Sequence, residues 1–469
     1  MKIDSLLLFA NLSDMQLAVF FLLIFTALIL FVSFLWAGVV SVVEKEFRAS
    51  KRFFLLSVIL PLPYLFLAFL EFDFQIPVGI ILLVVTYVSL LVLLIPAGKN
   101  KSFKSPTPLD RIDERDTMFS RRELVPASDA FQDYYKRKPE KKKADENFRS
   151  KAGLLNPASS QYKPIPFASA DASFETIAAL QDEVNGRVNN KVTNTNPDEI
   201  SNYLKKWSKK LGAVDCGITA LKEYHLYSVG GRKDRRDKPV VNTHKYAIAF
   251  TVEMDKEMVG AAPSASIVME SGQQYLESGI IALQVASFIR NLGFEARAHI
   301  DGNYEVVCPL VARDAGLGEI GRMGLLMTPK LGPRVRISVV TTNMPLQADK
   351  PKHDFSVIDF CTICKKCAEA CPSQAISVND REDINGVKRW QINQEKCFTL
   401  WCTLGTDCGR CIAVCPYSHP DNFLHNIVRE GNKNSSLFRK VALHLDDYFY
   451  GRKPLSAKFP EWANVKPLS

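Results

Sequence analysis

Histidine is scarce in this sequence, and cysteine is scarce outside one short region. The 469 residues include seven histidines, and none of them lies in the three long apolar stretches near the N-terminus. A haem held between membrane-spanning helices needs such ligands, so it is not expected. Of eleven cysteines, only Cys216 and Cys308 lie outside the segment 361–415. This excludes a disulfide-stapled scaffold and points to metal chemistry in one segment, while Cys216 and Cys308 are expected to be buried as small apolar side chains.

Three stretches contain no charged residue: 16–43, 53–70 and 76–97. A helix needs roughly 20 apolar residues to cross a bilayer, and each stretch is close to that length. Pro61 and Pro63 interrupt the second stretch, so we expect a kink there. A signal peptide would be shorter than the first stretch and would not be followed by two more spans, and no twin-arginine pair precedes it. We therefore predict a three-helix transmembrane anchor over residues 1–98.

Lysine and arginine are unevenly distributed around these stretches. The segment 44–52 contains four bases and the segment 99–111 contains four more, whereas the opposite side carries only Lys2. Short loops rich in lysine and arginine stay on the cytoplasmic side of a membrane. The sequence therefore predicts a multi-pass protein of the cytoplasmic (inner) membrane, with the lipid bilayer as a partner and the remaining chain facing the cytoplasm.

The formal net charge of +9 has a local source in a polar segment rich in proline and lysine, 99–165. Residues 131–151 within it contain eight bases and four acids. Beside a bilayer, such a segment attracts anionic headgroups. No aromatic-interleaved basic motif accompanies it, so we do not expect nucleic acid as a partner. We predict that residues 99–165 form a linker and an N-terminal extension of the globular part.

From about residue 166 the pattern becomes that of a globular domain. An Asn-Pro pair and a later glycine predict a helix over 196–211. Apolar residues at helical spacing predict a second helix over 272–292, and β-forming residues predict strands over 246–254 and 336–342. These elements do not alternate as regular βαβ units, and only the cysteine runs are repeated. The expected fold class is therefore α+β.

Residues 316–321 match the pattern GxGxxG of dinucleotide-binding folds. That fold needs a strand before the glycines and an acidic residue about 20 positions after them. Here a charged stretch precedes the glycines, and no acid lies between Glu319 and Asp349. We therefore do not expect a nicotinamide cofactor. The glycines instead predict a close approach of the backbone to another group.

The clustered cysteines follow the spacing of two-cluster ferredoxins. The first run is C-x2-C-x2-C-x3-C-P over 361–372, in which the fourth cysteine ligates the other cluster. The second run, C-x2-C-x3-C-P over 408–416, lacks a first cysteine because Gly405 stands there. Cys397 and Cys402 are the two alternatives for the missing ligand.

Eight cysteines then suffice for two [4Fe–4S] clusters. The predicted ligands of the first cluster are Cys361, Cys364, Cys367 and Cys415. The predicted ligands of the second are Cys371, Cys408, Cys411 and either Cys397 or Cys402. Structural zinc is the competing interpretation, but zinc sites lack the reciprocal Cys-Pro endings.

Several motifs resemble those of the corrinoid-dependent reductive dehalogenases. They are DERDTMFSR (113–121), AGLGEIGR (315–322), LLMTPKLGPRVR (325–336), CFTLW (397–401), GTDCGRCIAVCPY (405–417) and DDYFYGRKP (446–454). The AGLG segment and the cysteine runs also resemble epoxyqueuosine reductase, so a corrinoid reductase acting on a non-halogenated substrate is the alternative. A pure electron-transfer module is a third hypothesis, which the long globular stretch before residue 361 disfavours. Respiratory members of the family are usually exported, whereas here apolar spans are fused to the enzyme.

The resemblance implies a base-off cobalamin in a nitroreductase-like domain, supplied with electrons by a ferredoxin-like domain. It implies a cobalamin-binding catalytic domain over 166–350, a ferredoxin-like domain over 351–425, and an extension over 426–469 that packs on the catalytic domain. It selects Cys397 over Cys402. The residues that it implies around the corrinoid are Gly316, Leu317, Gly318, Gly321, Arg322, Met327, Thr328 and Gly332.

The resemblance also implies a tyrosine proton donor, supported by an arginine and by an amide or a carboxylate. These map to Tyr275, Arg336 and either Asn303 or Asp301. A tyrosine with a pKa near 10 keeps its proton at neutral pH, and a guanidinium stabilises the phenolate left after donation. The implied reaction removes halide from a small organohalide with Co(I). Its electrons come from a quinol, a ferredoxin or a flavodoxin through the clusters.

Overall fold

The computed structural model describes residues 14–69, 75–96, 108, 110–351 and 353–465. The chain forms two compact units. The first combines the N-terminal helices with residues 426–454, and the second combines residues 100–425 with residues 455–469. Each unit is described by itself below.

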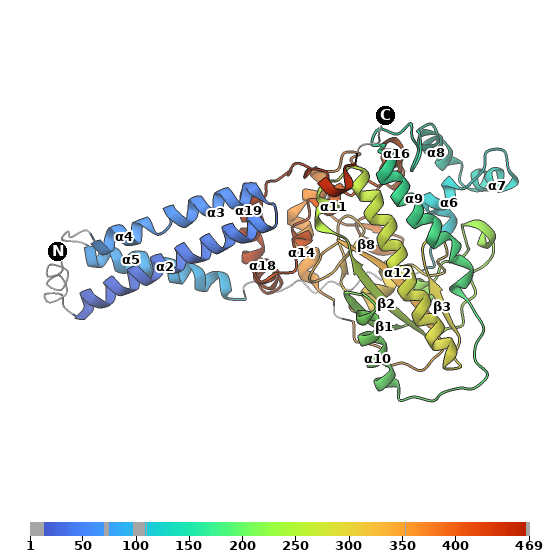
Figure 1. The fold of residues 1–469 in the computed structure, drawn as a ribbon, viewed down its shortest axis with the longest axis horizontal. Helices are drawn as coiled ribbons and strands as arrows, with labels where there is room; N and C mark the ends of the chain where they lie inside the picture. The colour runs from blue at the N-terminus through green and yellow to red at the C-terminus, as the bar shows by residue number, and fades with distance from the viewer. Residues whose placement is uncertain (1–13, 70–74, 97–107, 109, 352, 466–469) are drawn as a thin grey trace. The chain divides into compact units, whose positions relative to one another are not determined.

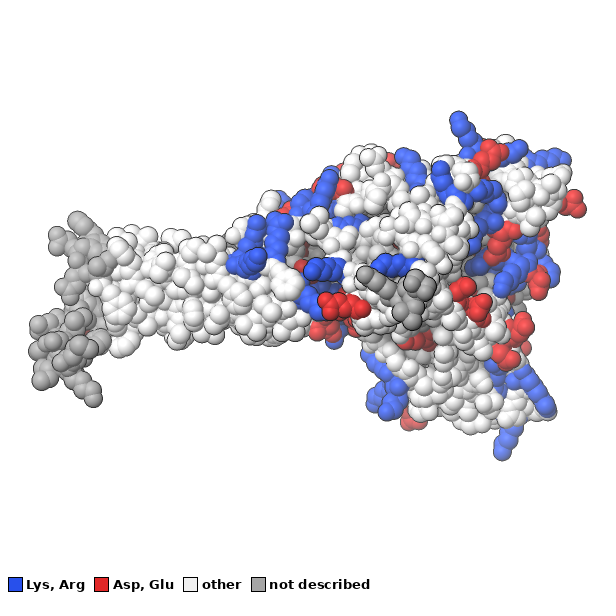
Figure 2. Space-filling view, turned by 45° about the horizontal axis from the view of Figure 1, so that its top comes forward, with Lys and Arg blue, Asp and Glu red and all other residues white. Residues whose placement is uncertain are grey.

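The first unit contains the apolar helices (Figure 1): α2 (Asp14–Val43), α3 (Phe47–Ile59), α4 (Leu62–Phe69) and α5 (Gln75–Leu94). By length and composition they provide three candidate membrane spans, Asp14–Val43, Phe47–Phe69 and Gln75–Leu94, as predicted. The second span is interrupted between α3 and α4, next to Pro61, because proline cannot donate a helical hydrogen bond. Figure 2 shows that most of the surface of these helices carries no charged side chain.

The predicted C-terminal extension is divided between the two units. Helix α19 (Ser436–Phe449) belongs to the first unit with most of α18 (Phe423–Asn434), and only residues from 455 onward join the second. The Phe449 ring stacks on Phe53 of α3, with 3.9 Å between ring centroids. That the whole of 426–469 packs on the catalytic domain stays a prediction. Within the first unit, α19 contacts α3 and α5.

The second unit is built on a four-stranded antiparallel sheet with the strand order β1-β2-β6-β3. The strands are β1 (Asp215–Ala220), β2 (Tyr246–Glu253), β6 (Val335–Thr342) and β3 (Ala296–His299). Alternate residues of β2 face opposite sides, because the side-chain period of a strand is two. Ile248 and Phe250 pack with α12 (Ala265–Asn291) and α10 (Pro197–Lys210). Ala247 and Ala249 pack with α13 (Cys308–Asp314), so both faces are covered and the α+β prediction is confirmed.

Predicted elements of this unit are present, with one displaced boundary. Helix α10 is capped as expected, since the Asn196 side chain accepts from the backbone N–H of Asp198 at 2.9 Å. Helix α12 begins at Ala265, seven residues before the predicted start at 272. Ser266, Glu270 and Ser271 are buried polar residues in this first part. They interrupt the apolar pattern from which the helix was predicted.

Much of the segment predicted as a linker is folded into the second unit. It contains α6 (Met118–Arg122), α7 (Asp129–Arg137) and α8 (Lys142–Arg149). The fully buried Arg121 pairs with Asp145 of α8 and, at 2.8 Å, with Glu395 of α16 (Gln394–Leu404). Lys141, from the basic run, lies 2.8 Å from the same Glu395 carboxylate. At least one base of this segment, Lys141, therefore forms an ion pair within the protein, although the whole segment was expected to attract lipid headgroups.

Candidate functional site

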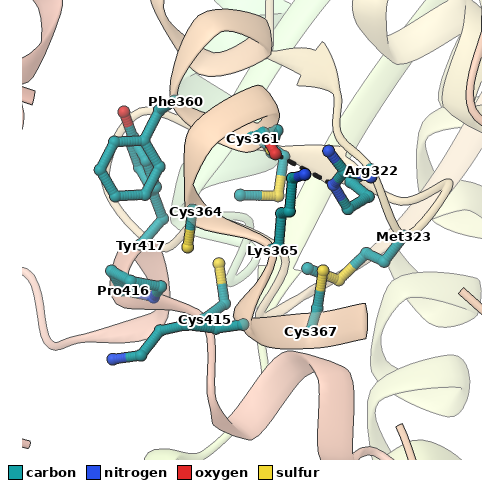
Figure 3. A pocket seen from close by; sticks show the side chains of 12 residues that line it. Arg322, Met323, Phe360, Cys361, Cys364, Lys365, Cys367, Cys415, Pro416 and Tyr417 are labelled. Atoms are coloured by element: carbon teal, nitrogen blue, oxygen red, sulfur yellow. Dashed lines mark hydrogen bonds between the residues drawn. The ribbon is translucent and has the colours of Figure 1, made fainter. Parts of the chain in front are cut away.

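Four cysteines of the second unit line one small cavity (Figure 3). Cys361 and Cys364 lie in α14 (Phe355–Cys364), Cys367 lies in α15 (Lys366–Glu369), and Cys415 directly precedes Pro416. Between α14 and α15 the backbone of Lys365 has φ 57°, in the left-handed region, which turns the chain so that the sulfur atoms face a common space. These are the four cysteines predicted for the first cluster. Buried soft thiolate donors around one space fit an iron–sulfur cluster.

A second group of cysteines surrounds Cys397 of α16. Burial and the nearby thiols of Cys371 and Cys408 raise the pKa of Cys397 to about 12. The pKa of Cys411 is raised by burial and, among other charges, by Cys397, Cys408 and Cys371. Thiols this close together in apolar surroundings resist ionisation, and iron ions would stabilise them as thiolates. The group therefore fits a cluster as well.

Cys402 lies apart from this second group. It is buried in an apolar cluster with Met118, Phe148 and Phe398. Although Cys402 is on the same helix as Cys397, the two are five residues apart and point to different sides of it. The choice of Cys397 that followed from the resemblance thus agrees with the packing.

Arg322, predicted to contact a corrinoid, lies against the first cysteine group. Its buried guanidinium donates to the carbonyl of Cys361 at 3.0 Å and to the carbonyls of Ser377 and Asn379 at 2.7 Å each. It also lies 4.6 Å from the centroid of the Trp390 ring. A positive charge held by carbonyls beside four cysteines complements the negative charge of a thiolate-bound cluster.

The glycine-rich segment packs on its own chain. Strand β4 (Glu319–Ile320) pairs with β5 (Leu326–Met327). A Cβ atom on Gly318 would lie 2.2 Å from the carbonyl oxygen of Met327, and a Cβ on Gly332, at φ +54°, would lie 2.6 Å from Cβ of Tyr417. The backbone at these glycines therefore lies close to other residues of the same chain. Helix α13 rather than a strand precedes the glycines, so the dinucleotide fold is absent here.

We expect Gly332→Ala to lower the free energy of unfolding by about 2–4 kcal/mol, from overpacking against Tyr417 plus the left-handed backbone. Gly153→Ala is the matched control, because Gly153 has φ +99° but no other atom within 4 Å of an added Cβ. Chemical unfolding of both variants measures the difference. Equal losses in the two would show that the contact with Tyr417 is unimportant.

A second cavity, of about 210 Å³, lies beside Tyr275 of α12 and Arg336 of β6. An apolar cavity of roughly 150 Å³ can hold benzene, so a small organic molecule fits this space. The guanidinium carbon of Arg336 lies 4.8 Å from the centroid of the Tyr275 ring. Burial raises the pKa of Tyr275, and the charge of Arg336 opposes this only in part. The phenol therefore remains protonated at neutral pH and has a cation beside it.

Two polar residues that the sequence did not single out hold Arg336 in place. Nη2 of Arg336 donates to Ser271 Oγ and lies 3.3 Å from Oδ2 of Asp407, which also accepts from Ser271 Oγ at 2.6 Å. Asp407 directly precedes Cys408, so this ion pair joins the arginine to the second cysteine group. Nε of Arg336 is buried and makes no hydrogen bond within the described residues. An acceptor on a bound molecule would satisfy that donor.

Asn303 and Asp301, the two candidates for the amide or carboxylate that supports the tyrosine, differ in their surroundings. The Asn303 side chain accepts from Nη2 of Arg297 at 2.7 Å and donates to the carbonyl of Gln181 at 3.1 Å. The charge of Asp301 is one of those that act on the pKa of Tyr275, after that of Arg336. Burial raises the pKa of Asp301 itself, and Arg232 and Arg336 oppose that rise. The choice between Asp301 and Asn303 stays a prediction.

The residues predicted around a corrinoid are not those that line the second cavity. Arg322 and Met327 line the first cysteine cavity instead. The residues that line the space beside Tyr275 are Tyr227, Tyr304, Val306, Cys308, Pro309, Leu325, Leu326, Pro333, Val335, Arg336 and Ile337. Leu325, Leu326 and Pro333 are sequence neighbours of the predicted positions, and the set predicted around a corrinoid stays a prediction. Tyr227 and Tyr304 belong to no motif, and nothing in the sequence marks them.

Comparison with known protein families supports the cysteine assignment. Residues 360–419 match the model of a 4Fe-4S dicluster domain. The chain is 32% identical over 300 residues to the tetrachloroethene reductive dehalogenase of Desulfitobacterium hafniense, covering 54% of each protein. It is 32% identical over 295 residues to the same enzyme of Sulfurospirillum multivorans, covering 55% of this chain and 58% of that one. The chain thus spans little more than half the length of these curated relatives.

Among solved structures, too, this chain is similar to reductive dehalogenases. A catabolic reductive dehalogenase, NpRdhA, superposes with a TM-score of 0.61 at 25% identity, covering 75% of this chain and 48% of that one. A reductive dehalogenase structure described as suggesting a mechanism for B12-dependent dehalogenation has a TM-score of 0.58 at 28% identity, covering 66% and 46%. Epoxyqueuosine reductase of Staphylococcus aureus is a weaker relative, 27% identical over 175 residues, or 31% of this chain and 41% of that protein.

Proposed function

We propose that this chain, a member of the reductive dehalogenase family, removes halide from a small organohalide. The observation that carries the proposal is the cavity beside Tyr275 and Arg336, in the same unit as two groups of four cysteines, the first of which is fully buried. The balanced reaction consumes two electrons and one proton for each carbon–halogen bond, and releases the hydrogen-substituted product and a halide ion.

The cofactors proposed are two [4Fe–4S] clusters and a base-off cobalamin. The clusters pass single electrons and are held by Cys361, Cys364, Cys367 and Cys415, and by Cys371, Cys397, Cys408 and Cys411. A bound cobalamin supplies low-valent cobalt, which has the electrons needed to cleave a carbon–halogen bond. Leu325, Leu326 and Pro333, which line the cavity beside Tyr275, would contact it through their apolar side chains.

The protein's own residues supply the proton and the environment. Tyr275 holds a proton on its phenol oxygen and delivers it to the substrate carbon. Arg336 stabilises the resulting phenolate, and its free Nε is a donor for a departing halide. Asp407 and Ser271 position the guanidinium, and the half-buried Asp301 balances the charge around it. Apolar side chains keep bulk water away from the reacting carbon.

Asp407→Asn is expected to slow halide release roughly tenfold, because Arg336 loses a charged partner, and about 1.4 kcal/mol corresponds to a factor of ten. Iron content should stay at the parent value, since the asparagine is not a ligand. Turnover and iron per chain are measured together. Asp133→Asn, at an exposed ion pair with Arg137, is the control. An unchanged rate would show that Asp407 does not position Arg336.

The test of the proposed function is reconstitution of the full chain, without oxygen, in detergent. With cobalamin, iron and sulfide added, we expect one cobalt and about eight irons per chain, as two four-iron clusters require. Halide release from a panel of chlorinated and brominated alkenes and phenols is then followed with a chemical reductant. Retention of both cofactors without halide release from any compound would contradict dehalogenation, and an epoxide substrate in the same assay tests the alternative reductase.

We further propose that the apolar helices anchor the chain in the inner membrane, with the second unit in the cytoplasm and a quinol, ferredoxin or flavodoxin as electron donor. The support is the distribution of bases, which follow the first and third spans but not the second. A reporter that is active only in the periplasm, fused to the N-terminus, should be active, and one fused after Ser469 should be inactive. The reverse result would invert the proposed orientation.

A further inference from the structure

Helices α18 and α19 expose rows of apolar side chains. On α18, Ile427 is 50% exposed. On α19, the exposed Leu437, Leu445 and Tyr448 are spaced by eight and three residues, which places them on one side of the helix. Single exposed apolar residues are common on soluble proteins, but a row along an amphipathic helix marks a contact surface.

These helices belong to the unit that contains the proposed membrane spans, and α19 packs on the start of one of them. Phe449 stacks on Phe53, and the guanidinium carbon of Arg52 lies 4.3 Å from the centroid of the Tyr448 ring. A Cβ atom on Gly451 would lie 2.8 Å from Nη1 of Arg48. Arg48, Arg52 and Phe53 lie in the first two turns of α3, directly after the connection from α2. A helix that enters a bilayer at this point has its first turns among the lipid headgroups, so α19 lies at the same depth.

The charge at this end of the unit is positive. Residues 44–52 and 426–454 together carry ten lysines and arginines against five acids. Figure 2 shows Lys and Arg side chains gathered at one end of the otherwise uncharged apolar helices. Apolar side chains combined with bases are the composition of helices that lie in the plane of an anionic membrane surface.

We propose that α18 and α19 form an interfacial membrane-binding surface. Its apolar row, Ile427, Leu437, Leu445 and Tyr448, enters the headgroup region of the leaflet from which α3 starts, and its exposed lysines bind anionic lipid headgroups. The inference rests on the proposed membrane anchor. It adds that the C-terminal part of the chain is held at the membrane by a second contact, separate from the three spans.

The test uses the full chain in phospholipid vesicles that contain phosphatidylglycerol and lipids brominated along the acyl chain. A tryptophan introduced by Leu445→Trp should be quenched at least twofold more than one introduced by Lys433→Trp, an exposed position of α18 that is six residues from Ile427 and so lies on another side of that helix. The quenching at residue 445 should fall when phosphatidylglycerol is replaced by phosphatidylcholine. The native Trp36, inside the first span, reports on the anchor and is isolated by comparison with Trp36→Phe.

Each outcome has a distinct meaning. Quenching of Trp36 together with equal, weak quenching at residues 445 and 433 would overturn the interfacial surface and leave the anchor intact. No quenching of Trp36 would overturn the anchor itself. The fluorescence of the tryptophan at residue 445 could instead change with protein concentration and not with brominated lipid. That result would assign the surface to a second copy of the chain and overturn the proposal.

Discussion

Replacing Tyr275 with phenylalanine is expected to slow halide release by about 10²–10⁴-fold, the contribution typical of a positioned proton donor. The substitution removes one oxygen atom and leaves the ring under Arg336, whose guanidinium carbon is 4.8 Å from the ring centroid. Cobalt and iron content should not change, because Tyr275 holds neither cofactor. The measurement is the initial rate of halide release by the reconstituted full chain at saturating reductant.

The matched control is Tyr304→Phe, which removes a phenol oxygen from the same cavity. We expect a loss of less than tenfold there. If both variants lost activity equally, the cavity would need two hydroxyl groups and Tyr275 would have no special role. Full activity of Tyr275→Phe would eliminate the proton-donor assignment while leaving dehalogenation itself standing.

The pH dependence follows from the same group. Burial raises the pKa of Tyr275 above that of free tyrosine. The proton donor therefore remains protonated as the pH rises through 9, and kcat should not fall in that range on its account. A decline in kcat with an apparent pKa near 7 would assign the proton to a different group.

Cys397→Ala is expected to reduce iron from about eight to about four atoms per chain and to abolish turnover with a chemical reductant. Cys397 is the proposed fourth ligand of the second cluster, and the thiols of Cys371 and Cys408 lie near it. A cluster that loses one of four thiolates is rarely retained intact, and without it the electron path is broken. Iron analysis and the electron paramagnetic resonance signal of the reduced protein measure the loss.

Cys402→Ala on the same helix provides the comparison. Its thiol is packed with Met118, Phe148 and Phe398, so the change removes a small apolar contact and costs about 1 kcal/mol of stability. Iron content and turnover should stay at parent values. The opposite pattern, with iron lost from Cys402→Ala and kept in Cys397→Ala, would reassign the second cluster.

The features that sequence reasoning predicted well are those set by neighbours along the chain. Uncharged stretches of 20 residues and cysteine spacings of three and four residues are local signals, and both appear in the structure as expected. Helix α12 was partly missed because its first turns bury Ser266 and Glu270, so they lack an apolar pattern.

What sequence reasoning missed depends on contacts between distant segments. The hydrogen bond from Ser271 to Asp407 joins residues that are 136 positions apart, and no local pattern marks either residue. The glycines of residues 316–321 were expected to allow a close approach of the backbone to another group. At Gly318 that group is the chain's own Met327, which spacing alone cannot show.

The ion pairs of Arg121 with Asp145 and Glu395 have a practical consequence for any shortened version of this chain. Glu395 lies two residues before Cys397, and its carboxylate accepts hydrogen bonds from Arg121 and Lys141. A chain that began after residue 150 would lose both cations together with α6 and α8, which pack against α16, and should be less stable than one that keeps them. Residues 110–150 thus support the helix that carries the proposed ligand Cys397, and shortened versions should begin no later than Asp110.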